Sequence, residues 1–168
     1  MMCGITGTPG TGKSMVGEEL ARRGHTVIHL TDTVGPYVSG NDEERDARII
    51  DIDRWAAEFV PVDGFVEGHL AHLLPCDRII VLRCRPDVLK TRLSLRKYRM
   101  EKIWENTDAE AMDVCLIETV DEYEPSRILE IDTTDHDVPY CADQIERFVK
   151  GEIAAGFGAI DWSEFLEV

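Results

Sequence analysis

The sequence lacks the features of a membrane protein or of a disulfide-stabilised secreted protein. Although 43% of its residues are apolar, no uncharged apolar run approaches the roughly 20 residues that a membrane span requires. Its five cysteines are odd in number and form no C-x-x-C pair, which argues against a disulfide framework and against a zinc site. The N-terminus has no basic region typical of a signal peptide. We therefore expect a cytoplasmic protein whose thiols are buried and reduced.

Positive charge is also scarce. The chain has 18 Lys and Arg against 33 Asp and Glu, for a net charge of −15. Such a field repels nucleic acid, so direct binding to RNA or DNA over a broad surface is not expected, whereas a basic protein partner is favoured. The scattered acids fit two explanations equally well, a protein from a high-salt cytosol, where repulsion is screened, or ordinary acidic solubility.

The chain has no internal repeat and no low-complexity linker, and its 168 residues fit one compact domain spanning 1–168. Apolar strand-like segments alternate with helical ones, which predicts an α/β fold with a parallel five-stranded sheet flanked by helices. The expected strands are 1–6, 26–30, 64–67, 78–83 and 127–131. The expected helices are 15–23, 86–96 and 101–123. Residues 35–47 are polar and predict a loop, with mobility plausible there.

The strongest motif runs from Gly7 to Ser14, with the sequence GTPGTGKS. It matches G-x-x-x-x-G-K-[ST], the phosphate loop of P-loop NTPases, and lies between a predicted strand and a predicted helix. The glycines allow backbone N–H groups to surround an oxyanion, and the following helix directs its positive dipole end toward the same place. Lys13 can reach the β- and γ-phosphates, and the Ser14 hydroxyl can ligate Mg²⁺. The motif predicts a site for ATP or another nucleoside triphosphate.

The rest of the sequence narrows the kind of phosphate-loop protein. A GTP switch is disfavoured because neither Asn41 nor Asn106 begins an Asn-Lys-x-Asp motif. A small kinase needs cations to meet the charge on the transferred phosphoryl group. Eight of the 18 basic residues lie between Arg83 and Lys102, and this run predicts a lid helix over phosphates. Arg92 and Arg96, at i and i+4, are expected on one face of it; a solvated basic face is the alternative.

Catalysis also needs an acid at the end of a neighbouring strand. Glu67 fits this role, and His69, two residues later, could contact the same water or phosphate. His72 is better explained as a structural histidine. Asp51 and Asp53 could face a second nucleotide, although acids before a helix are commonly N-caps.

Further short motifs occur in order along most of the chain. They are Ile50-Asp51-x-Asp53-Arg54, Glu67-Gly68-His69-Leu70-x-His72-Leu73-Leu74-Pro75, Val81-Leu82-Arg83, Arg92-Leu93-x-x-Arg96-x-Tyr98, Lys102-Ile103-x-Glu105-Asn106, Ala109-Glu110 and Asp132-Thr133-Thr134. In these motifs the chain resembles the small archaeal and eukaryotic nuclear-type adenylate kinases, which assist late maturation of the small ribosomal subunit.

The resemblance implies a nucleoside monophosphate kinase fold, with a monophosphate-binding segment at about 30–53 and a short lid at about 97–107. The implied reaction is the reversible conversion of ATP and AMP to two ADP with Mg²⁺, accompanied by ATPase activity. The implied partner is a basic ribosomal protein of the small subunit.

The same analogy gives roles to individual residues. Lys13 would stabilise the transferred phosphoryl group, and Arg96 would clamp it from the lid. Ser14 and Glu67 would serve the metal, and His69 would support hydrolysis. Backbone N–H groups for the phosphates would come from Gly10, Gly12 and Met15.

Three departures from the family pattern stand out. Family members commonly have Asp at the position of Glu67 and Gly at the position of Lys97. The acidic C-terminal segment 158–168, with Trp162 and Phe165, resembles haloarchaeal relatives.

Three functions remain open on the sequence. The first is a broad-specificity adenylate kinase with ATPase activity. The second is a ribosome-assembly ATPase whose kinase reaction is incidental. The third is a small-metabolite kinase of similar fold.

Overall fold

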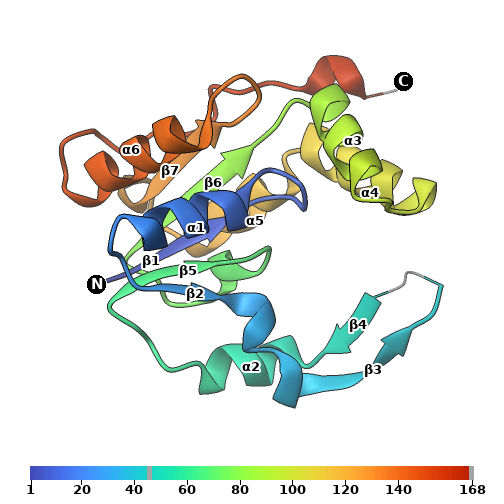
Figure 1. Ribbon diagram of the computed structural model, residues 1–168, viewed down its shortest axis with the longest axis horizontal. Helices are drawn as coiled ribbons and strands as arrows, with labels where there is room; N and C mark the ends of the chain where they lie inside the picture. The colour runs from blue at the N-terminus through green and yellow to red at the C-terminus, as the bar shows by residue number, and fades with distance from the viewer. Residues whose placement is uncertain (45–46, 167–168) are drawn as a thin grey trace.

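A five-stranded parallel sheet forms the centre of the computed structural model, which describes residues 1–44 and 47–166. The strand order is β2-β5-β1-β6-β7 (Figure 1). The strands are β1 (Met2–Thr6), β2 (Val27–His29), β5 (Gly64–Glu67), β6 (Arg78–Arg83) and β7 (Ile128–Asp132). This arrangement confirms the predicted α/β fold, and each predicted strand matches one of these to within a residue or two.

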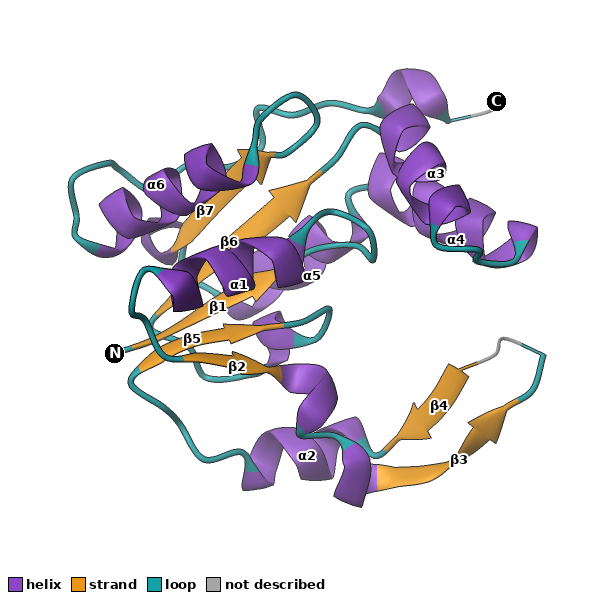
Figure 2. Cartoon of the chain, viewed as in Figure 1, coloured by secondary structure: helices purple, strands orange, loops and turns teal. Residues whose placement is uncertain are grey.

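Helices cover both faces of this sheet (Figure 2). Helices α1 (Lys13–Arg22) and α6 (Val138–Val149) pack on one face, and α2 (Ile52–Glu58) and α5 (Val114–Glu122) contribute to the core on the other. Strand β6 supplies both cores, because side chains alternate between the faces of a strand. Ile79 and Val81 join the α2/α5 side, while Ile80 and Leu82 join the α1/α6 side. Burial on both faces explains why β6 is an unbroken apolar run.

Helices α3 (Pro86–Leu95) and α4 (Met100–Ala111) pack together beyond the end of β6, around a small core that includes Leu89, Leu93 and Ile103. The prediction of one helix over 101–123 was wrong, because α4 ends at Ala111 and α5 begins at Val114. Between them Asp113 takes a left-handed backbone conformation with φ of 58°, which a continuous helix does not allow. Its carboxylate pairs with Arg83, a tertiary contact that the local pattern does not reveal.

Strands β3 (Val38–Asp42) and β4 (Ala47–Ile50) pair as an antiparallel hairpin, after a 3₁₀ turn at Gly35–Tyr37. The prediction of a loop over 35–47 was therefore wrong for the strand residues, and residues 45–46 lie outside the described part of the chain. The hairpin projects from the main body (Figure 2). After it, Asp51 caps α2 by accepting a hydrogen bond of 3.2 Å from the Arg54 backbone N–H, which confirms the interpretation of this acid as an N-cap.

The remaining elements are short. Besides Gly35–Tyr37, 3₁₀ turns occur at Leu30–Asp32, Ala71–Leu73, Pro125–Arg127 and Ser163–Phe165. The last of these lies against α4, so the C-terminal segment returns to the α3–α4 pair (Figure 1). The end of the expected segment 158–168, residues 167–168, lies outside the described residues. All five cysteines are buried and unpaired, as predicted. Within 1–44 and 47–166, no helix is long and apolar enough to cross a membrane.

Candidate phosphate-binding site

The Gly7–Ser14 loop connects β1, the central strand, to α1 at the carboxyl edge of the sheet, where open α/β sheets bind their ligands. Gly10 and Gly12 have φ of 91° and 104°, in the left-handed region that favours glycine. A Cβ on Gly10 would lie 2.8 Å from a Leu89 methyl carbon, whereas one on Gly12 would meet no atom within 4 Å. The loop is therefore packed against α3 on one side and open on the other.

Lys13 crosses this loop from its position as the first residue of α1. Its Nζ donates hydrogen bonds of 2.8 Å to the Gly7 carbonyl and 3.0 Å to the Thr8 carbonyl. Burial lowers the pKa of Lys13 to about 8, while the negative charges of Glu67 and Glu110 oppose this shift. At neutral pH the ammonium is therefore mostly charged and held where a phosphate would contact the loop.

Glu67 is the last residue of β5 and lies beside the first turn of α1. Its buried carboxylate accepts a hydrogen bond of 3.4 Å from the Ser14 hydroxyl. The same oxygen lies 2.5 Å from Nδ1 of His29, at the end of β2. The structure thus brings Ser14 and Glu67 into contact and places His29 beside them.

Ser14 and Glu67 fit Mg²⁺, which prefers hard oxygen ligands and commonly keeps several waters beside one or two protein groups and substrate phosphates. The described residues contain no group of three or more His, Cys, Asp or Glu side chains arranged to hold a metal ion. Mg²⁺ at a nucleotide site does not need a dedicated protein cage.

His69 follows Glu67 and lies over the first residue of the loop. Its Nδ1 is 3.2 Å from the Gly7 carbonyl, and because a carbonyl only accepts, we assign the ring proton to Nδ1. Desolvation, then the charge of Lys13, lowers the pKa of His69. The ring is therefore neutral at pH 7, with Nε2 free to accept a proton.

His72 has the structural role expected for it. The ring is buried, with Nδ1 2.9 Å from the Thr6 hydroxyl and Nε2 3.1 Å from a Glu118 oxygen. It supports the end of β1 through the Thr6 hydroxyl.

The basic run 83–102 does not form one lid surface, so that prediction needs correction. Arg83 is buried and pairs with Glu110, Glu130 and Asp113. Arg92 donates to the carbonyl (2.8 Å) and hydroxyl (3.1 Å) of Thr133. Arg83 and Arg92, which the sequence pattern assigned to the phosphates, are therefore bonded to other parts of the protein instead.

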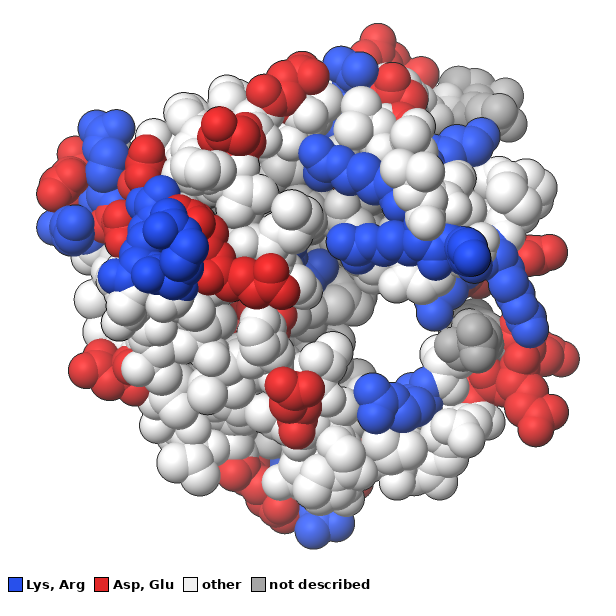
Figure 3. Space-filling view, viewed as in Figure 1, with Lys and Arg blue, Asp and Glu red and all other residues white. Residues whose placement is uncertain are grey.

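Arg96, in contrast, is exposed and could still contact a phosphate. It lies at the C-terminal end of α3, and its charge is close enough to lower the pKa of Lys13. Figure 3 shows Lys and Arg side chains around an opening between the α3–α4 region and the hairpin. Arg99, just before α4, donates a hydrogen bond of 3.2 Å to the carbonyl of Glu44, just after β3. The two projecting elements therefore touch at their outer ends.

Met15 lies in the first turn of α1 with an exposed side chain. Its backbone, with those of Gly10 and Gly12, belongs to the phosphate loop and the start of α1.

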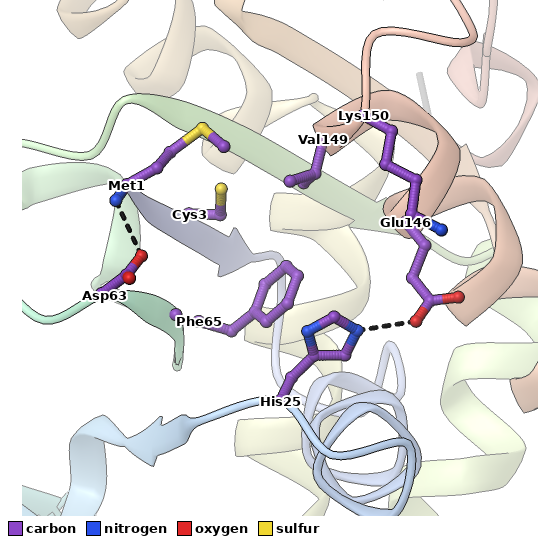
Figure 4. A pocket seen from close by; sticks show the side chains of 9 residues that line it. Met1, Cys3, His25, Asp63, Phe65, Glu146, Val149 and Lys150 are labelled. Carbon is purple, nitrogen blue, oxygen red and sulfur yellow. Dashed lines mark hydrogen bonds and ion pairs between the residues drawn. The ribbon is translucent and has the colours of Figure 1, made fainter.

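A separate cavity of about 180 Å³ lies at the opposite, amino edge of the sheet (Figure 4). Among its lining residues, the Met1 ammonium pairs with Asp63 at 2.8 Å, and His25 Nε2 lies 2.6 Å from a Glu146 oxygen. It has no glycine-rich loop and no part in the site described above.

Sequence reasoning missed His29 and assigned no role to Glu110, whose carboxylate accepts a hydrogen bond from Thr8. A signal for His29 was present, since 26–30 and 64–67 were both predicted as strands of one parallel sheet. His29 and Glu67 are register partners near the ends of those strands. Glu110 belongs to the Ala109-Glu110 motif, but that motif does not indicate its partner Thr8, which is 102 residues away.

Comparison with known proteins gives the family. Residues 3–113 match a family described as "AAA domain". A protein of Archaeoglobus fulgidus named "Putative adenylate kinase" is 41% identical over 99% of this chain and 94% of its own length. Proteins of the same name from Natronomonas pharaonis and Methanocaldococcus jannaschii are 41% and 37% identical, covering 99% and 98% of this chain and 100% and 94% of their own lengths.

The chain belongs to this archaeal adenylate kinase family. Solved structures support the fold. A shikimate kinase from Bacteroides thetaiotaomicron has a TM-score of 0.58 at 18% identity, covering 89% of this chain and 98% of its own. A gluconokinase from Sinorhizobium meliloti has a TM-score of 0.53 at 18% identity, covering 90% and 92%. The adenylate kinase family member described here thus has a P-loop kinase fold.

Proposed function

We propose that the protein is an adenylate kinase that transfers the γ-phosphoryl group of ATP reversibly to AMP, forming two ADP, and accepts other nucleoside monophosphates. One observation carries the proposal. In a chain of this family, the Lys13 ammonium is held against the carbonyls of the phosphate loop, and the next residue, Ser14, contacts the Glu67 carboxylate. The assay described below also tests the alternative that the protein transfers the phosphoryl group to a small metabolite.

The residues divide the work by their chemistry. The Lys13 ammonium neutralises charge on the β- and γ-phosphates, and backbone N–H groups of Gly10, Gly12 and Met15 orient them. Mg²⁺, when bound through Ser14 and Glu67, supplies charge neutralisation at the phosphate oxygens. Arg96 adds a second cation from the α3 side. Catalysis then rests mainly on positioning and on preorganised positive charge.

We assign AMP binding to residues 30–53 and the lid to residues 97–107, within a single domain. The hairpin lies in the first segment and the start of α4 in the second, and both border the opening in Figure 3. Asp53 is exposed in the first turn of α2, where a second nucleotide could contact it. Closure of the two segments would exclude water from the transfer step.

We also propose an ATPase activity supported by His69. Its neutral ring, with Nε2 free, can accept a proton from a water molecule beside the loop. Hydrolysis and transfer would share one ATP site and differ in the attacking oxygen.

The decisive assay incubates the full chain with Mg²⁺ and ATP, at low and at molar salt, with and without AMP, and measures ADP and free phosphate separately. ADP formed in AMP-dependent excess over phosphate is the expected result. Phosphate release indifferent to AMP would favour an assembly ATPase, and no turnover with AMP would favour a small-metabolite kinase.

We further propose that the protein acts in the cytoplasm in late small-subunit maturation, through a basic ribosomal protein of that subunit. The net charge of −15 supports a basic partner. Titration with such a purified protein should give saturable binding and change the ATPase rate. A basic protein of similar charge from outside the ribosome is the control, and equal binding of both would argue against the proposal.

A further inference from the structure

One acid near the phosphate loop has no part in the reaction proposed above. Glu110, in the last turn of α4, is 1% exposed. One carboxylate oxygen accepts a hydrogen bond of 2.5 Å from the Thr8 hydroxyl. The other accepts from Arg83 Nε at 2.8 Å and from the Cys84 backbone N–H at 3.0 Å. Glu110 therefore joins the phosphate loop to the end of β6.

Thr8 has two sides with different partners. Its carbonyl accepts hydrogen bonds from the Lys13 ammonium at 3.0 Å and from the Thr11 hydroxyl at 2.8 Å. Its side chain is 2% exposed and points away from these groups, to Glu110. The hydroxyl thus fixes the orientation of a peptide unit that the phosphate-binding lysine contacts.

The far side of Glu110 is fixed to the sheet. Arg83, 1% exposed at the end of β6, also pairs with Glu130 of β7 at 2.6 Å. The remaining guanidinium nitrogen, Nη2, donates a hydrogen bond of 3.0 Å to the backbone carbonyl of Glu110. Glu110 is consequently held in place by groups that do not belong to the loop, and its position depends on where α4 lies relative to the sheet.

We propose that Glu110 is a positioning residue that holds the phosphate loop in its binding conformation through Thr8 and couples the loop to α4. This inference rests on the proposed nucleotide site. Because Glu110 belongs to α4 and is bonded to Thr8, phosphates that order the loop also order α4.

Thr8→Val tests the proposal, because it removes the hydroxyl and leaves the Arg83–Glu110 pair intact. We expect the dissociation constant for ATP to rise about tenfold, since a hydrogen bond to a charged acceptor is lost. The KM for AMP should change less than about threefold. Thr8→Ser, which keeps the hydroxyl, should restore ATP affinity to within about threefold of native.

Thr119→Val is the matched control. Thr119 is buried in α5, and its hydroxyl donates a hydrogen bond of 2.7 Å to the Cys115 carbonyl, within its own helix. This variant loses a buried hydroxyl without touching the loop. It should lower the melting temperature comparably to Thr8→Val but leave ATP affinity near that of the native protein.

Hydrogen exchange provides the second measurement. Saturating ATP should slow exchange in residues 100–111 of the native protein and of Thr8→Ser, but not of Thr8→Val. Native ATP affinity in Thr8→Val, or equal weakening in the Val and Ser variants, would overturn the proposal. Failure of the native protein to bind ATP would instead refute the proposed function, so the two failures are distinguishable.

Discussion

At the scale of single residues, Lys13 combines burial with a charge that phosphate binding requires. Its pKa of about 8 means that the ammonium loses its proton within the range of ordinary assays. We expect ATP affinity to be constant below about pH 7 and to fall above pH 8, approaching about tenfold per pH unit, because only the charged form binds phosphate well. Calorimetric titration with ATP from pH 6.5 to 9.5 measures this profile.

Lys13→Arg is the control for this profile, since an arginine stays charged throughout. Its ATP affinity should be pH-independent over the same range, even if weaker. The free energy of unfolding gives an independent check, because it should rise over the pH range in which ATP affinity falls. Between about pH 8 and 10.5 the native Lys13 binds fewer protons than the unfolded one, so its contribution to the free energy of unfolding rises with pH. A pH profile indistinguishable from that of Lys13→Met would contradict the assigned pKa.

His69 separates the two proposed activities. In His69→Ala the rate of ATP hydrolysis should fall by about 100-fold, the usual contribution of a general base. Phosphoryl transfer to AMP should fall far less, because AMP supplies its own ionised oxygen. Separate assays of free phosphate and ADP measure both. His136→Ala is a matched control, since His136 is exposed and stacks on Tyr140; equal loss of both activities in His69→Ala would refute the assignment.

Sequence predicts position best where neighbours along the chain decide it. The positions of Lys13 and Ser14 were predictable because the strand end, the glycine-rich loop and the helix start lie within a few residues of one another. Arg83 and Arg96 looked alike in one basic run, yet one is buried among three acids and the other is exposed. What distinguishes them is the position of Glu110, Asp113 and Glu130, 27 to 47 residues further along, which no local pattern encodes.

At the scale of elements, the Arg83 cluster joins β6, β7, α4 and the α4–α5 junction. Removing one partner of a buried ion pair leaves uncompensated charge. We therefore expect Arg83→Met to lower the free energy of unfolding by about 3–5 kcal/mol, with Glu110 and Glu130 left unpaired. Urea unfolding followed by circular dichroism measures this. Arg85→Ala is the control, because Arg85 pairs with Asp87 at the surface. A comparable loss of unfolding free energy in both variants would mean that burial of the ion pairs does not determine their contribution to stability.

The same cluster explains two element boundaries that periodicity could not give. Asp113 takes a left-handed conformation where its carboxylate meets Arg83, so the apolar pattern over 101–123 continues while the helix does not.

The β3–β4 hairpin was missed for a different reason. Its strands alternate half-buried and exposed positions or are largely exposed, so they carry little of the apolar signal that identified the central strands.

The turn between α3 and α4 contains a non-glycine residue in an unfavourable conformation. Lys97 has φ of 60°, which costs an L-residue about 1–2 kcal/mol, whereas glycine adopts it freely. Lys97→Gly should therefore raise the free energy of unfolding by up to about 1 kcal/mol, after the greater entropy of the unfolded glycine chain is subtracted. Urea unfolding measures the change. Lys97→Ala separates the effect of charge from that of backbone, because alanine keeps the strain; stabilisation by both variants would point to charge.

At the scale of the whole molecule, the net charge of −15 opposes folding through self-repulsion. Screening lengths fall from about 30 Å at 0.01 M salt to about 3 Å at 1 M. Repulsion among scattered surface acids is long-ranged, whereas the Arg83–Glu110 and Arg83–Glu130 pairs are buried and at contact distance, so salt weakens the former far more. We expect the melting temperature to rise with KCl over this range, most steeply at the low end. Arg83→Met should show the same salt-dependent rise from a lower starting value. A melting temperature that falls with KCl would mean that exposed ion pairs outweigh the net repulsion.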